Sequence, residues 1–323
     1  KNAYFYMRKI RSLLIAGLFT LTALAQQDLQ FTQFMNNKLY YNPGVAGSSG
    51  SICINGVHRS QWVGFENAPT TQNINAEIPF EFLHGAFMVN ITNDQIGFFQ
   101  DIKFGLGYSF NTSLWEGNLG LGIELDFINK GMTKGTWVPP DQGAQDASLA
   151  NLVDGNTTMT PELNFGAYFE RPDFYVGISS SQLLSAKHGL QSQEVGEITE
   201  IKGERHYFFM GGYNWSIPNT AFVLQPAVLL KSDFKSPLQA DINVSTLYNN
   251  KVWGGLSYRL QDAVSIMLGY YILPSLRLSY SYDLTTSSLR TASSGSHEVM
   301  LNYCFKIVIP EKEPGYYRNP RFL

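Results

Sequence analysis

The sequence has few of the features that mark helical membrane proteins or highly charged soluble domains. After residue 25 no stretch is apolar enough for a membrane-spanning helix, which needs about 20 apolar residues. Charged residues make up 15% of the chain, against about 25% in ordinary soluble domains. The mean hydropathy is −0.12, so a hydropathy plot alone would not indicate a membrane protein.

Signatures of catalysis and metal binding are also missing. The five histidines include no pair at i and i+4, so the HExxH spacing for zinc is absent. No GxSxG nucleophile motif occurs. The pairs Gly105/Gly107 and Gly120/Gly122 resemble nucleotide-binding loops only superficially, because they lie inside predicted strands with no helix after them. We therefore predict no enzymatic activity, cofactor or metal, and expect these glycines to make room inside the fold.

The first 25 residues have the features of a secretory signal peptide. Met7–Arg11 is a basic segment, residues 13–24 are apolar, and Ala23–Ala25 provides a small-x-small cleavage site. Met7 is the expected start, and Lys1–Tyr6 precede it. The mature chain would begin at Gln26, which is not the cysteine that a lipoprotein requires.

Nucleic acid is an unsuitable partner for this chain. The leader holds four basic residues and no acid, so 19 Lys and Arg remain against 26 Asp and Glu, a net charge of −7. Binding to nucleic acid requires a clustered basic surface. Aromatic residues are frequent instead, at 14%.

What the sequence contains is a repeated alternation of side chains. In residues 276–284 every second residue is Leu or Tyr, and the residues between them are Arg, Ser, Ser and Asp. Successive side chains of a strand point to opposite faces, so one face is apolar and the other polar. The pattern recurs about a dozen times. Repeated amphipathic strands without helices predict a closed barrel that faces lipid, because backbone in a bilayer must satisfy its own hydrogen bonds.

We predict an all-β fold, a transmembrane antiparallel up-and-down β-barrel of about 14 strands with an N-terminal periplasmic lead or plug. We divide the chain into a signal peptide with upstream residues (1–25), an N-terminal periplasmic lead or plug (26–50), the outer-membrane barrel (51–309) and a periplasmic C-terminal tail (310–323). The strands are expected near residues 51–58, 71–79, 85–92, 102–111, 118–129, 160–169, 173–181, 205–215, 221–231, 238–248, 251–260, 263–272, 275–284 and 297–309.

The expected connections between these strands alternate in length. Short ones fall near 80–84, 112–117, 170–172, 216–220, 249–250 and 273–274. Most others are longer, near 59–70, 93–101, 130–159, 182–204 and 285–296, whereas those at 232–237 and 261–262 are brief. Outer-membrane barrels have short periplasmic turns and longer outer loops, and an even strand count predicts both termini in the periplasm.

Charged residues within the strands follow the same parity. We expect the following to face the lumen and to pair with one another or with the N-terminal segment: Glu124, Asp126, Asp241, Arg259, Arg277 and Asp283. On the lipid face Arg or Lys would cost about 2–4 kcal/mol near the midplane. A secreted β-sandwich or solenoid also alternates, and it remains an alternative that would require an aqueous location.

Six segments, in this order, resemble the PorP/SprF family of type IX secretion system outer-membrane proteins. They are Asp28–Met35, Asn42–Gly47, Arg59–Phe65, Ala68–Thr71, Gly295–Tyr303 and Arg318–Leu323. The resemblance implies an outer-membrane barrel that serves the type IX system of gliding and related bacteria. It also implies one of two kinds of partner. Some members contact a periplasmic ring lipoprotein and a peptidoglycan-binding partner, and others hold the C-terminal domain of an exported cargo or surface adhesin.

Residues in these segments are candidates for partner binding: Asn42, Pro43, Trp62, Phe65, Pro69, Tyr316, Tyr317, Arg318 and Arg321. Each has a structural alternative. Trp62 and Pro69 could tuck the first outer loop over the lumen, since a buried Trp in a loop usually serves packing. Residues 26–47 could plug the periplasmic mouth, lie along the outside, or merely seal the base of the barrel.

Two functions fit the sequence. The first is a non-enzymatic anchor or export accessory for type IX cargo in the outer membrane. The second is an outer-membrane transporter or channel for a hydrophobic solute, with an N-terminal plug. A transporter needs a continuous path, whereas an anchor needs a filled lumen and a binding surface at its mouth.

The two cysteines lie in the first and last predicted strands, which are neighbours when an up-and-down barrel closes. Cys53 and Cys304 both share the inward parity and both sit toward the periplasmic end. The periplasm permits a disulfide if the Cα atoms come within about 7 Å. The alternative is two small buried residues at unrelated heights.

Overall fold

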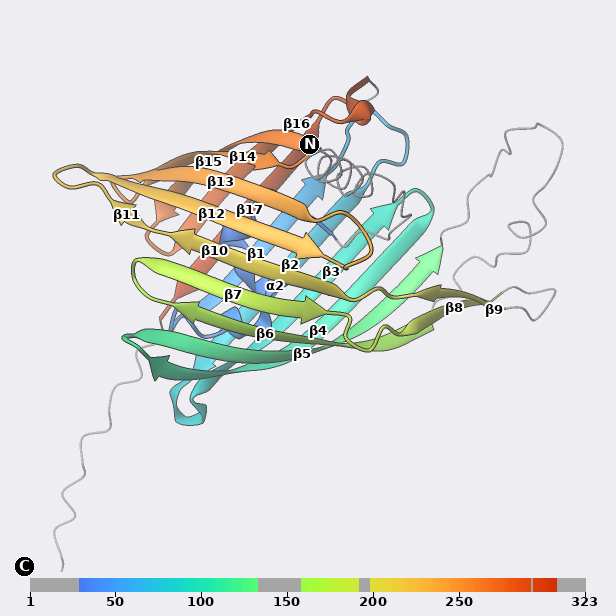
Figure 1. Ribbon diagram of the computed structural model, residues 1–323, viewed down its shortest axis with the longest axis horizontal. Helices are drawn as coiled ribbons and strands as arrows, with labels where there is room; N and C mark the ends of the chain where they lie inside the picture. Colours follow the sequence, from blue (N-terminus) through green and yellow to red (C-terminus); the bar gives the residue numbers. More distant parts are fainter. Residues whose placement is uncertain (1–28, 133–157, 192–197, 292, 307–323) are drawn as a thin grey trace, which may run out of the picture.

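Fourteen strands form a closed antiparallel barrel in the computed structural model, which describes residues 29–132, 158–191, 198–291 and 293–306 (Figure 1). In order around the wall they are β1 (Ile52–Ser60), β2 (Thr70–Phe80), β3 (Gly85–Ile96), β4 (Phe99–Leu114), β5 (Gly117–Met132), β6 (Thr158–Glu170), β7 (Phe174–Ser181), β10 (His206–Tyr213), β12 (Phe222–Ser232), β13 (Gln239–Tyr248), β14 (Val252–Arg259), β15 (Ala263–Leu273), β16 (Leu276–Thr285) and β17 (Ser296–Phe305). The predicted fold is confirmed, and each predicted strand overlaps one strand of the wall.

Two pairings complete the ring. β1 pairs with β17 from Ile52↔Phe305 to Ser60↔His297, and β10 pairs with β12. The short strand β11 (Trp215–Ser216) adds to the edge of β12. A separate hairpin, β8 (Lys187–Gln191) with β9 (Ile198–Lys202), lies in the connection between β7 and β10.

The two faces of the wall reverse the arrangement of a soluble protein. Large apolar side chains cover the outside, where Leu256 and Leu268 are 60% and 61% exposed. Polar side chains fill the inside, where Asn243 and Ser281 are fully buried. The alternation along each strand produces both faces at once, and a wall that is apolar outside requires lipid around it.

Aromatic side chains gather at the end of the barrel where the short turns lie. Phe82 and Trp115 are 75% and 79% exposed. The Phe80 ring centroid lies 5.9 Å from that of Phe82 and 5.6 Å from that of Phe87. Trp and Tyr are enriched where a bilayer meets water, so these rings indicate a membrane boundary at this end.

The two ends of the barrel differ in their connections, as expected. At one end, here called the short-turn end, β4–β5, β6–β7, β13–β14 and β15–β16 are joined by short turns, and η3 (Glu81–Leu83) joins β2 to β3. The opposite end, here called the long-loop end, carries residues 61–69, the β8–β9 hairpin and η4 (Ser288–Thr291). The long loop expected at 130–159 falls mostly on residues 133–157, outside the described residues.

One expected loop is wrong. Residues 93–101 belong mostly to a hairpin, because β3 and β4 continue to pair through Asp94↔Asp101 and Ile96↔Phe99. Only 97–98 turn the chain, with Gly97 at φ +59°. The two strands were expected to end at residue 92 and to begin again at residue 102, but their backbone pairing extends four residues beyond the first limit and three before the second.

Residues 29–47 lie inside the barrel and form a plug (Figure 1). The plug contains η1 (Phe34–Asn36), α2 (Lys38–Tyr41) and η2 (Pro43–Val45). No helix among the described residues is long and apolar enough to cross a membrane. Phe31 and Tyr40 pack edge to face at 4.9 Å, and Tyr41 reaches Phe208 of the wall at 5.5 Å. The segment therefore reaches further into the lumen than a plug of the periplasmic mouth or a seal at the base of the barrel would.

The plug crosses the lumen from one end to the other. Its first residues, Leu29 and Gln30, line a cavity at the long-loop end together with Gln61 and Trp62. The residues that follow the plug line a cavity at the short-turn end, where β17 also finishes. Leu29 and Lys306, the first and last described residues, therefore lie toward opposite ends of the barrel, whereas the two termini expected in the periplasm lie outside the described residues.

Candidate functional site

A cluster of buried charges in the lumen, near the long-loop ends of β1, β16 and β17, holds the start of the plug. Arg59 of β1 forms ion pairs with Asp283 at 2.7 Å and with Glu298 at 3.2 Å. Glu298 accepts hydrogen bonds from the backbone N–H groups of Thr32 and Gln33, at 2.8 and 2.9 Å. The Thr32 hydroxyl lies 2.8 Å from the Asp283 carboxylate. Three strands and the plug thus share one network of charge-assisted hydrogen bonds.

The second half of the plug fits into a recess made by glycines. Asn42 donates to the carbonyl oxygens of Ala167 at 3.0 Å and Ile178 at 3.2 Å. A Cβ placed on Gly122 would lie 2.2 Å from the carbonyl carbon of Pro43, and one on Gly120 would lie 2.1 Å from the Gly44 oxygen. Of the inward glycines predicted to make room, Gly120 and Gly122 therefore do so for the plug, whereas Gly105 and Gly107 face side chains and backbone of the wall.

This geometry corrects the partner-binding role suggested for Asn42 and Pro43. Both residues are buried, and Asn42 is fully so. The Asn42 amide is occupied with the wall, and its carboxamide oxygen accepts from the Gly44 N–H at 2.8 Å. Neither residue presents a surface to another protein.

The long-loop cavity lies on one side of the plug, with a volume of about 420 Å³. Trp62 and Pro69 line it, in agreement with the alternative that they fold the first loop over the lumen. The Trp62 N–H donates to Ser296 Oγ at 3.1 Å. Phe65 of the same loop is 39% exposed, so of Trp62, Phe65 and Pro69 it is the residue most accessible to a partner.

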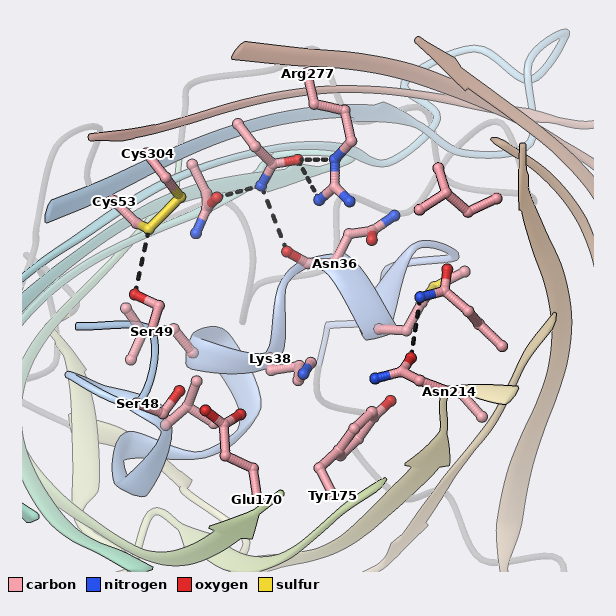
Figure 2. A pocket seen from close by; sticks show the side chains of 18 of the residues that line it. Asn36, Lys38, Ser48, Ser49, Cys53, Glu170, Tyr175, Asn214, Arg277 and Cys304 are labelled. Carbon is pink, nitrogen blue, oxygen red and sulfur yellow. Dashed lines mark hydrogen bonds between the residues drawn. A yellow bond between two sulfur atoms is a disulfide. The ribbon is translucent and has the colours of Figure 1, made fainter. Parts of the chain in front are cut away.

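The short-turn cavity lies on the other side of the plug, also with a volume of about 420 Å³ (Figure 2). The lining residues of the two cavities do not overlap, since the plug stands between them. Lys38 donates to the Tyr168 hydroxyl at 2.9 Å and lies 3.8 Å from the Tyr175 ring centroid. Burial lowers the pKa of Lys38 to about 8, against the opposing charge of Glu170.

All six charged residues expected in the lumen lie inward, but not all have charged partners. Arg259 pairs with Asp241 at 2.8 Å, and Asp283 pairs with Arg59 and contacts the plug. Lys103 lies 3.4 Å from Asp126.

Of the six predicted lumen charges, Glu124 and Arg277 form hydrogen bonds with the side-chain amides of asparagines. The Asn164 amide donates to Glu124 at 2.9 Å and to Asp126 at 2.7 Å. Arg277 donates from Nε and Nη2 to the single oxygen Asn302 Oδ1, at 3.0 and 2.7 Å. The expectation that inward charges pair with opposite charges or with the plug therefore does not hold for Arg277.

Arg59, Glu298 and Lys38 were missed from the sequence. Arg59 shares the parity of Cys53, and Glu298 shares that of Cys304. The alternation rule would have found both if it had been extended to the ends of these strands. Lys38 lies in a segment without alternation, and no local signal indicates its place.

Cys53 and Cys304 occupy the rim of the short-turn cavity and form a disulfide, with Cα atoms 4.1 Å apart. Tyr316, Tyr317, Arg318 and Arg321 lie outside the described residues. Among the described residues, no group of three or more His, Cys, Asp or Glu could hold a metal ion.

Residues 23–303 match the family model described as type IX secretion system membrane protein PorP/SprF. No curated protein matches the sequence.

Several solved structures match the chain at low identity. The CymD monoaromatic hydrocarbon channel is 10% identical over 80% of this chain and 88% of its own, with a TM-score of 0.47. Omp33 of Acinetobacter baumannii is 10% identical over 80% of this chain and 99% of its own, with a TM-score of 0.46. The Pseudomonas putida toluene transporter TodX is 10% identical over 83% and 92%, with a TM-score of 0.44.

Proposed function

Because the chain belongs to the PorP/SprF family of type IX secretion system membrane proteins, we propose that it is a non-enzymatic outer-membrane barrel that anchors or assists the export of a cargo protein. The partner would be the C-terminal domain of a cargo or adhesin, a periplasmic ring lipoprotein with its peptidoglycan-binding partner, or both. The long-loop end would face the medium, and the short-turn end the periplasm.

The plug is the observation that carries this proposal. It lies between the two cavities and is bonded to opposite parts of the wall, through Glu298 at one point and through Ala167 and Ile178 at another. A lumen filled in this way favours a protein that offers its two mouths as binding surfaces. It argues against the alternative of a transporter for a hydrophobic solute, which needs a continuous path.

Affinity capture tests the proposal most directly. The full chain, tagged in the 140–150 region, would be purified from membranes of its native host in mild detergent, and co-purifying proteins identified by mass spectrometry. A large surface protein or type IX ring components should be enriched over a sample from cells that carry an unrelated tagged barrel. Recovery of neither would contradict the proposal.

A further inference from the structure

The cations of the lumen differ in how their charge is balanced. Toward the long-loop end, four cations each have a carboxylate partner: Arg59 at 2.7 Å, Arg259 at 2.8 Å, Lys103 at 3.4 Å and Lys130 at 2.5 Å. Lys38 and Arg277, which line the short-turn cavity, form no ion pair within the described part of the chain. A buried charge without a counter-charge is costly, so this contrast points to a missing anion.

The surroundings of Arg277 leave its charge largely unopposed. Its guanidinium contacts the amide oxygen of Asn302 and the hydroxyl of Tyr271, the latter at 3.4 Å. The guanidinium carbon also lies 6.0 Å from the centroid of the Trp253 ring. These contacts orient the planar group but supply no negative charge.

Acidic residues of the same cavity are engaged elsewhere. Glu77 accepts from the Gly47 N–H at 2.7 Å and from Ser49 Oγ at 3.3 Å. Glu170 accepts from the Tyr168 hydroxyl at 3.0 Å, so Tyr168 stands between Glu170 and Lys38. The charges of Glu170 and Glu77 thus act on Lys38 without a direct ion pair, and the hydrogen bonds of the Arg277 guanidinium go to Asn302 and Tyr271 rather than to a carboxylate.

Two hydrogen-bond donors of the cavity also lack a partner. Asn36 Nδ2 and the Tyr175 hydroxyl are buried atoms without a hydrogen bond. Figure 2 shows Asn36, Lys38, Tyr175 and Arg277 around the same space. Unsatisfied buried donors beside unpaired cations form a set that suits an acceptor with negative charge.

We propose that the short-turn cavity binds a carboxylate group of a polypeptide, with Arg277 and Lys38 as its counter-charges and with Asn36 and Tyr175 as further donors. A guanidinium matches the planar carboxylate, and the rings of Trp253 and Tyr271 suit an adjoining apolar side chain. This site does not depend on the anchoring role proposed above. The carboxylate has two possible sources, a separate polypeptide or Glu311 and Glu313 of the residues that follow β17.

Calorimetric titration of the full chain in detergent tests the site with N-acetyl-Phe-Leu as the probe and its amide as the matched ligand. The free acid should bind, and the amide about tenfold more weakly or worse. This comparison needs no variant, so it is independent of any folding defect. Equal binding of acid and amide, or no binding of the acid at millimolar concentration, would overturn the proposal.

Variants then assign the binding to the two cations. Arg277→Gln and Lys38→Met should each weaken binding of the acid about tenfold or more. Lys103→Met, which removes a cation on the other side of the plug, should leave it unchanged. If Lys103→Met weakens binding as much as the other two, the response reflects the overall charge of the lumen and the site is rejected.

A further variant separates the two sources. In the full chain, Glu311→Gln with Glu313→Gln should strengthen binding of the probe if these residues occupy the cavity. Unchanged binding would assign the site to a separate polypeptide.

Discussion

Cys53 lies directly opposite Cys304 across the β1–β17 pair, with their sulfur atoms bonded and 251 positions of sequence between them. The bond therefore joins the first and last strands of the wall at the point where the barrel closes. Since the flanking positions Ile52↔Phe305 and Ile54↔Tyr303 are also paired, the cysteines meet because the strand register brings them together.

We predict that this disulfide is present in the mature protein. Alkylation without reductant followed by mass spectrometry should leave both cysteines unmodified. Cys53→Ser should lower the free energy of unfolding by about 2–5 kcal/mol, seen as a lower temperature for the gel-mobility shift of the barrel. Cys304→Ser should behave the same, and reductant should not destabilise either variant further. Ready alkylation of the untreated protein would show that the bond is absent.

Loss of the buried Arg59 should destabilise the barrel strongly. Arg59→Met leaves Asp283 and Glu298 without this counter-charge, and removal of one partner from a buried ion pair costs about 3–5 kcal/mol. Urea unfolding in detergent micelles, followed by tryptophan fluorescence, measures the change. Addition of Glu298→Gln to Arg59→Met should recover part of the loss.

The exposed pair Lys235–Glu204 provides the control for this experiment. Lys235→Met should cost less than about 1 kcal/mol, because surface ion pairs contribute little. Similar losses for Arg59→Met and Lys235→Met would mean that the buried network around Arg59 contributes no more stability than a surface ion pair.

The amino end of the mature chain should be accessible from the same side as the long loops. Leu29 is only three residues beyond the expected cleavage site, a span of about 10 Å. A short epitope after Gln26 and one in the 140–150 region should both be labelled on intact cells. An epitope at 249–250 should be labelled only after the outer membrane is opened. Labelling of the 249–250 epitope alone on intact cells would invert the topology.

The full chain should not form a steady pore in planar bilayers, because the plug occupies the lumen. Gly122→Ala should produce intermittent currents, since the added Cβ would collide with the backbone of Pro43 and Gly44. Gly56→Ala is the matched control, because nothing lies within 4 Å of a Cβ at that position. Steady currents from the unmodified chain would favour the transporter function instead.

The wall of the barrel could be predicted from the sequence because lipid and lumen impose a period of two on every strand. Arg259 and Asp283 were placed inward simply because they alternate with apolar residues. The same rule fails where the strands leave the membrane. Asp94 and Gln100 are polar on both sides of a turn, yet their backbones remain paired within the hairpin of β3 and β4.

The path of the plug could not be predicted, because it is determined by contacts between distant positions. Thr32 is bound by Glu298, 266 positions away, and Asn42 by Ala167, 125 positions away. No local pattern encodes such partners. The one local feature of the sequence that relates to the plug is the pair of inward glycines at 120 and 122. This pair indicates where the wall leaves space, but not which segment fills it.

The path of residues 29–47 also constrains the order in which the protein is assembled. A finished cylinder could receive this segment only if the amino end travelled the whole length of the interior. A simpler order of assembly is that the plug takes its place first and that β1 and β17 then pair around it, which closes the barrel. Any residues that remain attached ahead of Gln26 would then have to lie at the long-loop end before the barrel closes.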